Sequence, residues 1–205
     1  MRQKLLAQPK TAGQVAPKSR RSPASKLSVE EAGKPVSSSL RIYCGIDNGT
    51  SGSIGILAPG LPPFWSATPI KKCRNYQKIE RHLNRVDAER LFDILHDRLY
   101  VPIQQGSTGL VLMERPYCNP TGFNASMLAA RALEATLVIV DLLNLEYRFV
   151  DSKEWQTVML PKGIIGRDEL KSASFEVGKK LFPGTKFKKD ADSLLMAQWA
   201  KNANL

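Results

Sequence analysis

The chain has 205 residues, of which 42% are hydrophobic, and this is enough for one folded domain with a core. No apolar run reaches the roughly eighteen residues of a membrane span, because Asp141 interrupts the longest run, LVIVDLLNL, so we expect a soluble protein. The three cysteines and two histidines form no CxxC or HxxxH pair, which excludes a zinc site of that kind and favours a reducing compartment.

The net charge of +11 is concentrated at the N-terminus, where residues 1–28 hold seven Lys and Arg and no acid. Residues 1–38 are also rich in Ser, Ala, Pro and Gln, which predicts a disordered basic arm ahead of a folded domain at 39–205. The arm is open to three interpretations: contact with nucleic acid, an organelle transit peptide or a solubilising tail. A transit peptide would place the protein in a chloroplast or mitochondrion, and otherwise we expect the cytoplasm or nucleoid of a prokaryote or phage.

Three strands are predicted at the start of the domain. Residues 40–46 (LRIYCGI) are β-rich and apolar, and an Asn-Gly turn joins them to a second strand at 53–57. Residues 64–70 (FWSATPI) predict a third strand, with its proline at an edge or an end. The polar, basic residues 71–85 that follow are predicted to form a loop.

Helices and further strands alternate in the rest of the domain. Asp87 is a candidate N-cap for a helix that runs to about Tyr100. The apolar run 110–113 predicts a buried strand, and Glu114 lies at its carboxyl end because Arg-Pro follows. The remaining predicted elements are a helix at 124–144, a strand at 145–151 and helices at 167–182 and 191–202. This order predicts a mixed α/β fold whose sheet starts with a three-stranded antiparallel meander and is flanked by helices.

Acidic residues stand at the ends of three of these elements. Asp47 and Glu114 each end a buried strand, where an ionised carboxylate is costly unless it is paired or binds a metal. Asp190 and Asp192 precede the apolar run of the last helix, where a helix N-cap and a charge favourable to the helix dipole are the alternatives. Carboxylates that converge suit Mg²⁺, and two such ions about 4 Å apart support phosphodiester hydrolysis.

The motif order resembles a known family. Asp47 in GIDNGTSGSIGIL, Glu114 in VLMERP and the acidic pair in DADSLLMAQWA resemble the RuvC-type Holliday junction resolvases, which have an RNase H-like fold. The stretches DSKEWQTVML and GRDELKSASFEVGKKLFP resemble the branch with phage and chloroplast enzymes. The likeness spans about residues 40–202.

This resemblance implies a homodimer that binds two Mg²⁺ per active site, with Mn²⁺ as a substitute, and cuts opposed strands of a four-way DNA junction. It assigns Asp47, Glu114 and Asp192 as catalytic metal ligands. Asp190 departs from the usual family spacing, and it is either a fourth ligand or a helix cap. No small-molecule cofactor and no membrane are expected.

The GIDNGT stretch also resembles the first phosphate loop of the actin, Hsp70 and sugar-kinase superfamily. Proteins of that superfamily need two such domains and a second phosphate loop. The roughly 165 residues of the predicted domain contain no second glycine-rich loop after a strand. We therefore interpret Asp47 as a metal ligand.

Basic and aromatic residues near these motifs are candidates for contact with DNA. A charge run is commonly only a solvated face, but an acidic site that takes a polyanion needs cations beside it. Tyr117 and Phe123 follow Glu114 and could stack on unpaired bases, although Phe123 is equally suited to pack against the next helix. The candidate DNA-binding residues are Lys71, Lys72, Arg74, Arg115, Tyr117, Phe123, Lys188 and Lys189.

The predicted helix at 124–144 is apolar on nearly every side, which requires burial on more than one face. A second helix of the same chain or a second subunit could cover it, and a two-fold junction suits a two-fold protein. Three functions stay open: a Mg²⁺-dependent junction endonuclease, an inactive protein that binds branched DNA, and a ribonuclease acting on RNA–DNA hybrids.

Overall fold

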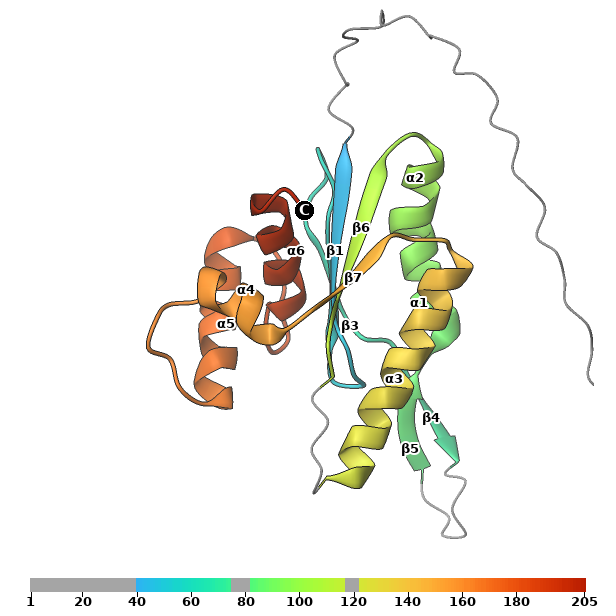
Figure 1. Ribbon diagram of the computed structural model, residues 1–205, viewed down its shortest axis with the longest axis horizontal. Helices are drawn as coiled ribbons and strands as arrows, with labels where there is room; N and C mark the ends of the chain where they lie inside the picture. The colour runs from blue at the N-terminus through green and yellow to red at the C-terminus, as the bar shows by residue number, and fades with distance from the viewer. Residues whose placement is uncertain (1–39, 75–81, 117–121) are drawn as a thin grey trace, which may run out of the picture. The chain divides into compact units, whose positions relative to one another are not determined.

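A computed structural model describes residues 40–74, 82–116 and 122–205. Its centre is a five-stranded mixed sheet in the order β3-β2-β1-β6-β7 (Figure 1). The strands are β1 (Arg41–Asp47), β2 (Ser53–Leu57), β3 (Phe64–Ala67), β6 (Thr108–Glu114) and β7 (Tyr147–Val150). The first three form an antiparallel meander, while β6 runs parallel to β1 and β7 parallel to β6. The predicted RNase H-like mixed sheet is therefore confirmed.

A second, two-stranded antiparallel sheet corrects the sequence prediction for residues 71–85. Strands β4 (Ile70–Arg74) and β5 (His82–Val86) pair where a loop was expected. Apolar residues face each other at two places along this hairpin, Ile70 opposite Val86 and Cys73 opposite Leu83. Basic residues stand between these two apolar pairs. Because of them, the composition of the segment does not indicate a strand.

Helices cover both faces of the main sheet (Figure 1). The elements on one side are α1 (Ala88–Leu95), the π-helix η1 (His96–Tyr100), α2 (Val101–Gln104) and α3 (Phe123–Leu142). The elements on the other side are α4 (Ser152–Met159), α5 (Arg167–Leu181) and α6 (Asp192–Asn202). The helices predicted near α3, α5 and α6 are confirmed, whereas α4 was not predicted. Within the described stretches, no helix is long and apolar enough to cross a membrane.

The start of α1 differs in detail from the prediction that Asp87 caps it. Asp87 occupies the N-cap position in an extended conformation, but its side chain makes no capping hydrogen bond. Its carboxylate lies 3.8 Å from both the Lys71 ammonium and the Arg90 guanidinium. The helix therefore starts where the sequence predicts, with the carboxylate of Asp87 turned to nearby cations.

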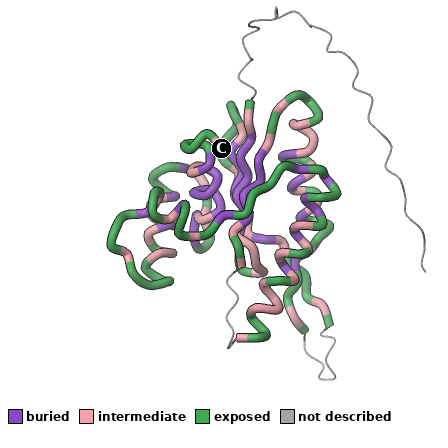
Figure 2. The backbone as a smooth tube through the Cα atoms, in the orientation of Figure 1, coloured by how far each residue is buried: buried purple, intermediate pink, exposed green. Residues whose placement is uncertain are grey.

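Two apolar cores lie on the two faces of the sheet, and strand alternation assigns residues to them. In β1, Ile42, Cys44 and Ile46 pack in the core under α1 and α3, whereas Tyr43 packs in the core under α4, α5 and α6. Buried residues concentrate in the central strands and in α6 (Figure 2). By the same alternation, Asp47 belongs to the face that α6 covers.

Glycines let α6 approach the sheet closely. A Cβ atom added at Gly45 would lie 2.1 Å from the Ser193 carbonyl oxygen, and one at Gly55 would lie 2.4 Å from the Leu194 backbone nitrogen. Backbone cannot yield as a flexible side chain does, so both positions require glycine. This contact sets the height of α6 above β1 and β2, and with it the position of Asp192.

Gly55→Ala should therefore destabilise the protein by about 3 kcal/mol, because overpacking against backbone forces α6 away from the sheet. Urea denaturation followed by circular dichroism measures the loss. Gly60→Ala is the control: its Cβ meets nothing within 4 Å, and its φ of 73° costs only about 1 kcal/mol. Equal losses for the two variants would contradict the close-contact explanation.

Candidate metal centre

Asp47 and Glu114 are the last residues of two neighbouring strands. β1 and β6 are parallel with Ile46 opposite Met113, so the two acidic residues that follow stand side by side at the same end of the sheet. Ile46 and Met113 both pack under α1 and α3, and their successors therefore point to the opposite face. The sequence prediction that these carboxylates converge is consistent with this register.

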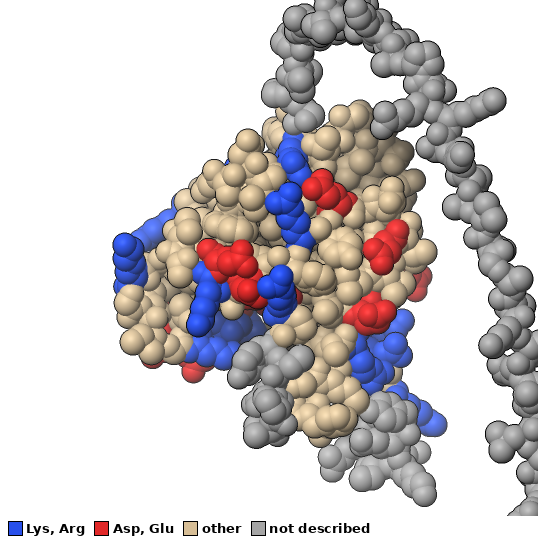
Figure 3. Space-filling view, in the orientation of Figure 1, with Lys and Arg blue, Asp and Glu red and all other residues tan. Residues whose placement is uncertain are grey.

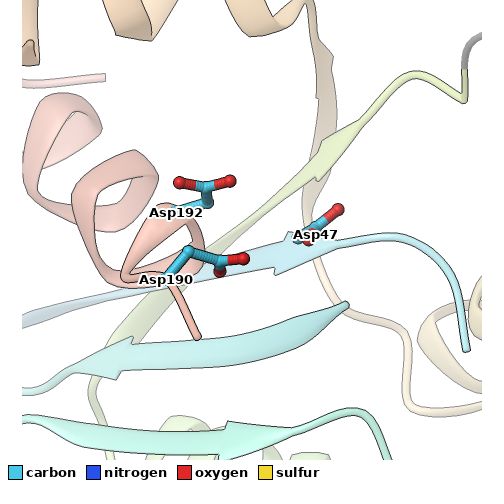
Figure 4. A group of neighbouring side chains, drawn as sticks. All are labelled: Asp47, Asp190 and Asp192. Atoms are coloured by element: carbon cyan, nitrogen blue, oxygen red, sulfur yellow. The ribbon is translucent and has the colours of Figure 1, made fainter. Parts of the chain in front are cut away.

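Asp190 and Asp192 complete the group from the segment that leads into α6 (Figure 4). One carboxylate oxygen from each of Asp47, Asp190 and Asp192 lies within 4.8 Å of the others. Asp192 is the first residue of α6, whose N-cap position is occupied by Ala191. The interpretation of Asp190 as the cap of this helix is therefore wrong.

Asp190 is instead held by a cation from α5. Its side chain is buried, and its Oδ2 accepts a hydrogen bond from Lys171 Nζ at 2.9 Å. Lys189 Nζ lies 3.9 Å from the same oxygen and donates to the Ser51 carbonyl at 3.2 Å. A buried carboxylate without such a partner would be strongly unfavourable, so Lys171 makes the position of Asp190 possible.

Ser174 connects α5 to the start of α6. Its hydroxyl donates to Asp192 Oδ1 and accepts a hydrogen bond of 3.2 Å from the Ala191 backbone N–H. At the next residue of α6, the Ser193 hydroxyl accepts a hydrogen bond of 2.8 Å from the Ser53 hydroxyl of β2. These bonds fix the orientation of the Asp192 carboxylate relative to β1 and β2.

Burial, and then the proximity of other carboxylates, raises the pKa values of three acidic residues. Burial, then the neighbouring Asp190, raises the pKa of Asp47 to about 6. Burial, then the same neighbour, raises the pKa of Asp192 to about 7, although the Ser174 hydrogen bond opposes this. Burial, with Asp47 and Asp192 nearby, raises the pKa of Glu114 to about 8.

An open cavity of about 470 Å³ gives access to this group. Asp47, Glu114 and Asp192 line it, together with Arg167 and Lys171 of α5. Among the described residues, the four carboxylates of this group are accompanied by three cationic side chains, Lys171, Lys189 and Arg167. Clustered oxygen donors with excess negative charge fit a hard divalent cation such as Mg²⁺.

The predicted DNA-binding residues lie in several places. Lys71, Lys72 and Arg74 are exposed on the hairpin strand β4, where basic side chains gather (Figure 3). Arg115 pairs with Asp151 at 3.0 Å, and Lys188 is exposed beside Lys189. Tyr117 lies outside the described residues. Phe123 begins α3 and is 74% exposed, so the proposed packing of its ring against that helix is wrong.

Several residues of the site were missed from the sequence. Lys171, Ser174 and Arg167 come from one face of α5, at spacings of four and three that a helical pattern brings together. Ser152 and Trp155 of α4 lie close enough to Glu114 to favour its ionised form. Their signal was the sequence DSKE, a capping box in which Glu154 accepts a hydrogen bond of 3.0 Å from the backbone N–H of Asp151, the N-cap of α4.

No protein-family model matches the sequence, and no curated protein matches it. Among solved structures, the chain is similar to T. thermophilus RuvC in complex with a Holliday junction substrate, at 13% identity and a TM-score of 0.49, over 80% of this chain and 94% of that chain. It is also similar to a Thermus thermophilus RuvC structure, at 12% identity and a TM-score of 0.47, over 80% of this chain and 96% of that chain. At these values the likeness assigns no activity to this chain.

The raised pKa values predict that the metal-free protein loses stability as pH rises. The folded protein holds protons on Asp47, Asp192 and Glu114 up to about pH 6, 7 and 8, above their ordinary values near 4, so stability is full at low pH and falls through this window. Each pKa unit corresponds to about 1.4 kcal/mol. Urea denaturation with a chelator between pH 5 and 8.5 measures the fall.

Mg²⁺ should reverse this fall, because a bound cation stabilises the ionised carboxylates. Asp47→Asn should flatten the metal-free profile and remove most of the gain from Mg²⁺. A metal-free stability that stays level or rises from pH 5 to 8.5 would show that the pKa values of these carboxyl groups are not raised in the folded protein.

Proposed function

We propose that this protein is a metal-dependent endonuclease that cuts four-way (Holliday) DNA junctions by hydrolysing phosphodiesters. The observation that carries the proposal is the cluster of Asp47, Asp190 and Asp192, whose oxygens lie within 4.8 Å of one another beside Glu114 at an open cavity. The order of these acids in the sequence, with its resemblance to RuvC-type resolvases, supports a branched DNA substrate. Mg²⁺ is the proposed cofactor, with two ions per site.

Each residue of the site has a proposed role. Asp47, Glu114 and Asp192 hold the divalent cations, which when bound supply a more acidic water and neutralise charge on the phosphate. Asp190 is a fourth ligand or an electrostatic support, fixed by Lys171 at 2.9 Å. Arg167, at the start of α5, lines the same cavity and is suited to contact a phosphate oxygen.

Basic residues outside the cavity supply the attraction for a polyanion. Lys71, Lys72 and Arg74 present exposed cations on the β4–β5 hairpin, which is suited to grip a DNA arm. Phe123, with its ring 74% exposed, is a candidate for stacking on a base near the crossover. An inactive junction-binding protein would gain from losing negative charge beside the phosphates, so the retained carboxylates favour the nuclease.

Asp47→Asn, Glu114→Gln and Asp192→Asn should each lower Mg²⁺-dependent junction cleavage by about a thousandfold or more, because each removes a ligand. Junction binding should be unchanged or tighter, because each also removes a negative charge near phosphate. Single-turnover cleavage of a labelled four-way junction measures the rate, and gel shift in Ca²⁺ measures binding.

A linear duplex and an RNA–DNA hybrid serve as comparison substrates in the same assay. Asp168→Asn is the control variant, since this acid lies exposed in the first turn of α5. Cutting of the hybrid in preference to the junction would replace the proposed function with that of a ribonuclease. Near wild-type cleavage by any of the three acid variants would remove that residue from the ligand set.

The proposed assembly is a homodimer, with α3 in the interface. Helix α3 packs on the sheet and on α1, so a neighbouring helix of the same chain covers part of its second face. Val138 and Leu142 remain exposed, at 48% and 72%, beside an apolar groove of about 650 Å³ between α1, α3 and the β4–β5 hairpin. A two-fold partner on this face would present two sites to the two equivalent strands of a junction.

Val138→Lys should weaken dimerisation by tenfold or more, because an unpaired lysine would be buried in the interface. Leu137→Lys is less suitable, because Leu137 already packs against the core of its own chain. Sedimentation velocity with and without a junction measures the assembly. Val158→Lys is the control, at an apolar residue that is 66% exposed on α4, across the sheet.

Loss of the dimer should also convert paired cuts into single nicks within one binding event. A wild-type protein that sediments as a monomer both alone and on the junction would contradict the homodimer.

A further inference from the structure

A second groove lies next to the acidic cavity, along the edge strand β3. We call it the β3 groove; it has a volume of about 860 Å³, and its lining includes Ser51, Thr68, Arg90, Asp93, Lys186 and Lys188. Ser51 lines both this groove and the acidic cavity, so the two spaces meet at that residue. An extended ligand that leaves the acidic cavity over Ser51 therefore enters the β3 groove.

An aromatic anchor positions the two lysines of the groove. The ring of Phe187 makes edge-on contacts with Trp65 of β3, at 5.8 Å between centroids, and with Phe175 of α5, at 6.4 Å. Its two neighbours in sequence, Lys186 and Lys188, are both exposed and both line the groove. The inward ring thus holds the segment in place, and the ammonium groups on either side of it line the groove at the edge of the sheet.

The groove carries a net positive charge, and most of its cationic side chains are unpaired among the described residues. Lys186 and Lys188 form no ion pair with any residue of the described part of the chain. Arg90 has only a 3.8 Å contact with Asp87, and its side chain is 76% exposed. Asp93 is the single acid of the lining, against three cations. Unpaired cations along a groove attract an anionic chain.

The floor of the groove suits a sugar-phosphate backbone better than a base. Gly52, Ser66 and Ala67 are small and allow close approach. The hydroxyl of Thr68 and the indole N–H of Trp65 are buried and have no hydrogen-bond partner among the described residues. Each would donate to a phosphate oxygen after a small side-chain movement, which would relieve the cost of leaving it unsatisfied.

We infer that the β3 groove binds phosphates of the DNA strand that continues from the scissile position, with Lys186 and Lys188 as its principal contacts. This inference rests on the proposed function, because the strand is the substrate of the acidic site. The groove fixes the path of the strand without reading its sequence, because cations and hydroxyl groups that contact phosphate carry no base information.

The test is a double substitution, Lys186→Ala with Lys188→Ala, measured as junction affinity in Ca²⁺ to prevent cutting. We expect affinity to fall about tenfold at moderate salt, and the slope of log affinity against log salt to become shallower by about 1.8, for two lost phosphate contacts. The matched control is Lys180→Ala with Lys201→Ala, two exposed lysines near the C-terminal ends of α5 and α6.

A neutral methylphosphonate placed singly at positions flanking the scissile phosphate locates the contact. It should weaken wild-type binding at one or two positions on one side and have no such effect on the double variant, which a merely structural role for the lysines would not produce. Competition by free inorganic phosphate at low millimolar concentration would indicate a site for that ion and overturn the assignment to a strand.

Failure of the inference and failure of the proposed function give different results. If the wild type cuts junctions and the double variant matches its control in affinity and salt slope, the β3 groove is not a strand site although the nuclease assignment stands. If the wild type neither binds nor cuts any DNA tested, both are overturned. The Mg²⁺-dependent gain in stability should be equal in the wild type and the double variant, because the acidic cluster is untouched.

Discussion

The acidic site depends on packing that keeps several buried carboxylates close together. Asp47 and Glu114 leave neighbouring strands on one face, and α6 brings Asp192 to the same place because Gly45 and Gly55 let its backbone lie against the sheet. The raised pKa values of these carboxylates are the electrostatic cost of that packing. A core of apolar contacts under α4, α5 and α6 offsets the cost, and the site exists only while those contacts hold.

The sequence predicted the sheet, and that Asp47 and Glu114 stand at strand ends, because both leave local signals. The apolar runs before Asp47 and Glu114 define strand ends, and parallel pairing then makes them neighbours. It failed for Lys171, because an ion pair across 19 positions leaves no local pattern. The pairing of β4 with β5 was missed because their few apolar pairs are interrupted by cations. Asp190 was ambiguous, since helix capping and metal binding use the same residue type, and the position of Ala191 at the N-cap removes the first alternative.

Cations in this molecule serve two different purposes. Lys171 and Lys189 point inward, where they compensate Asp190 and tie the Ser51 turn to the segment before α6. Lys186 and Lys188 stand four and two positions before the buried Asp190, yet they face outward because Phe187 takes the inward position between them. Net charge alone cannot distinguish these roles, because both kinds contribute equally to the basic balance of the chain.

In β1 and β6, successive side chains point to opposite faces of the sheet, and this affects which substitutions the protein can accept. Side chains that build the acidic site and side chains that support α3 come from the same strands but from opposite faces. The two sets therefore share the strand backbone and do not pack against each other. A substitution on the α3 face can alter the packing of that helix and leave the carboxylates in register. The packing of α3 and the geometry of the carboxylates can therefore change separately, except at Gly45 and Gly55, where a side chain would displace α6 from the sheet.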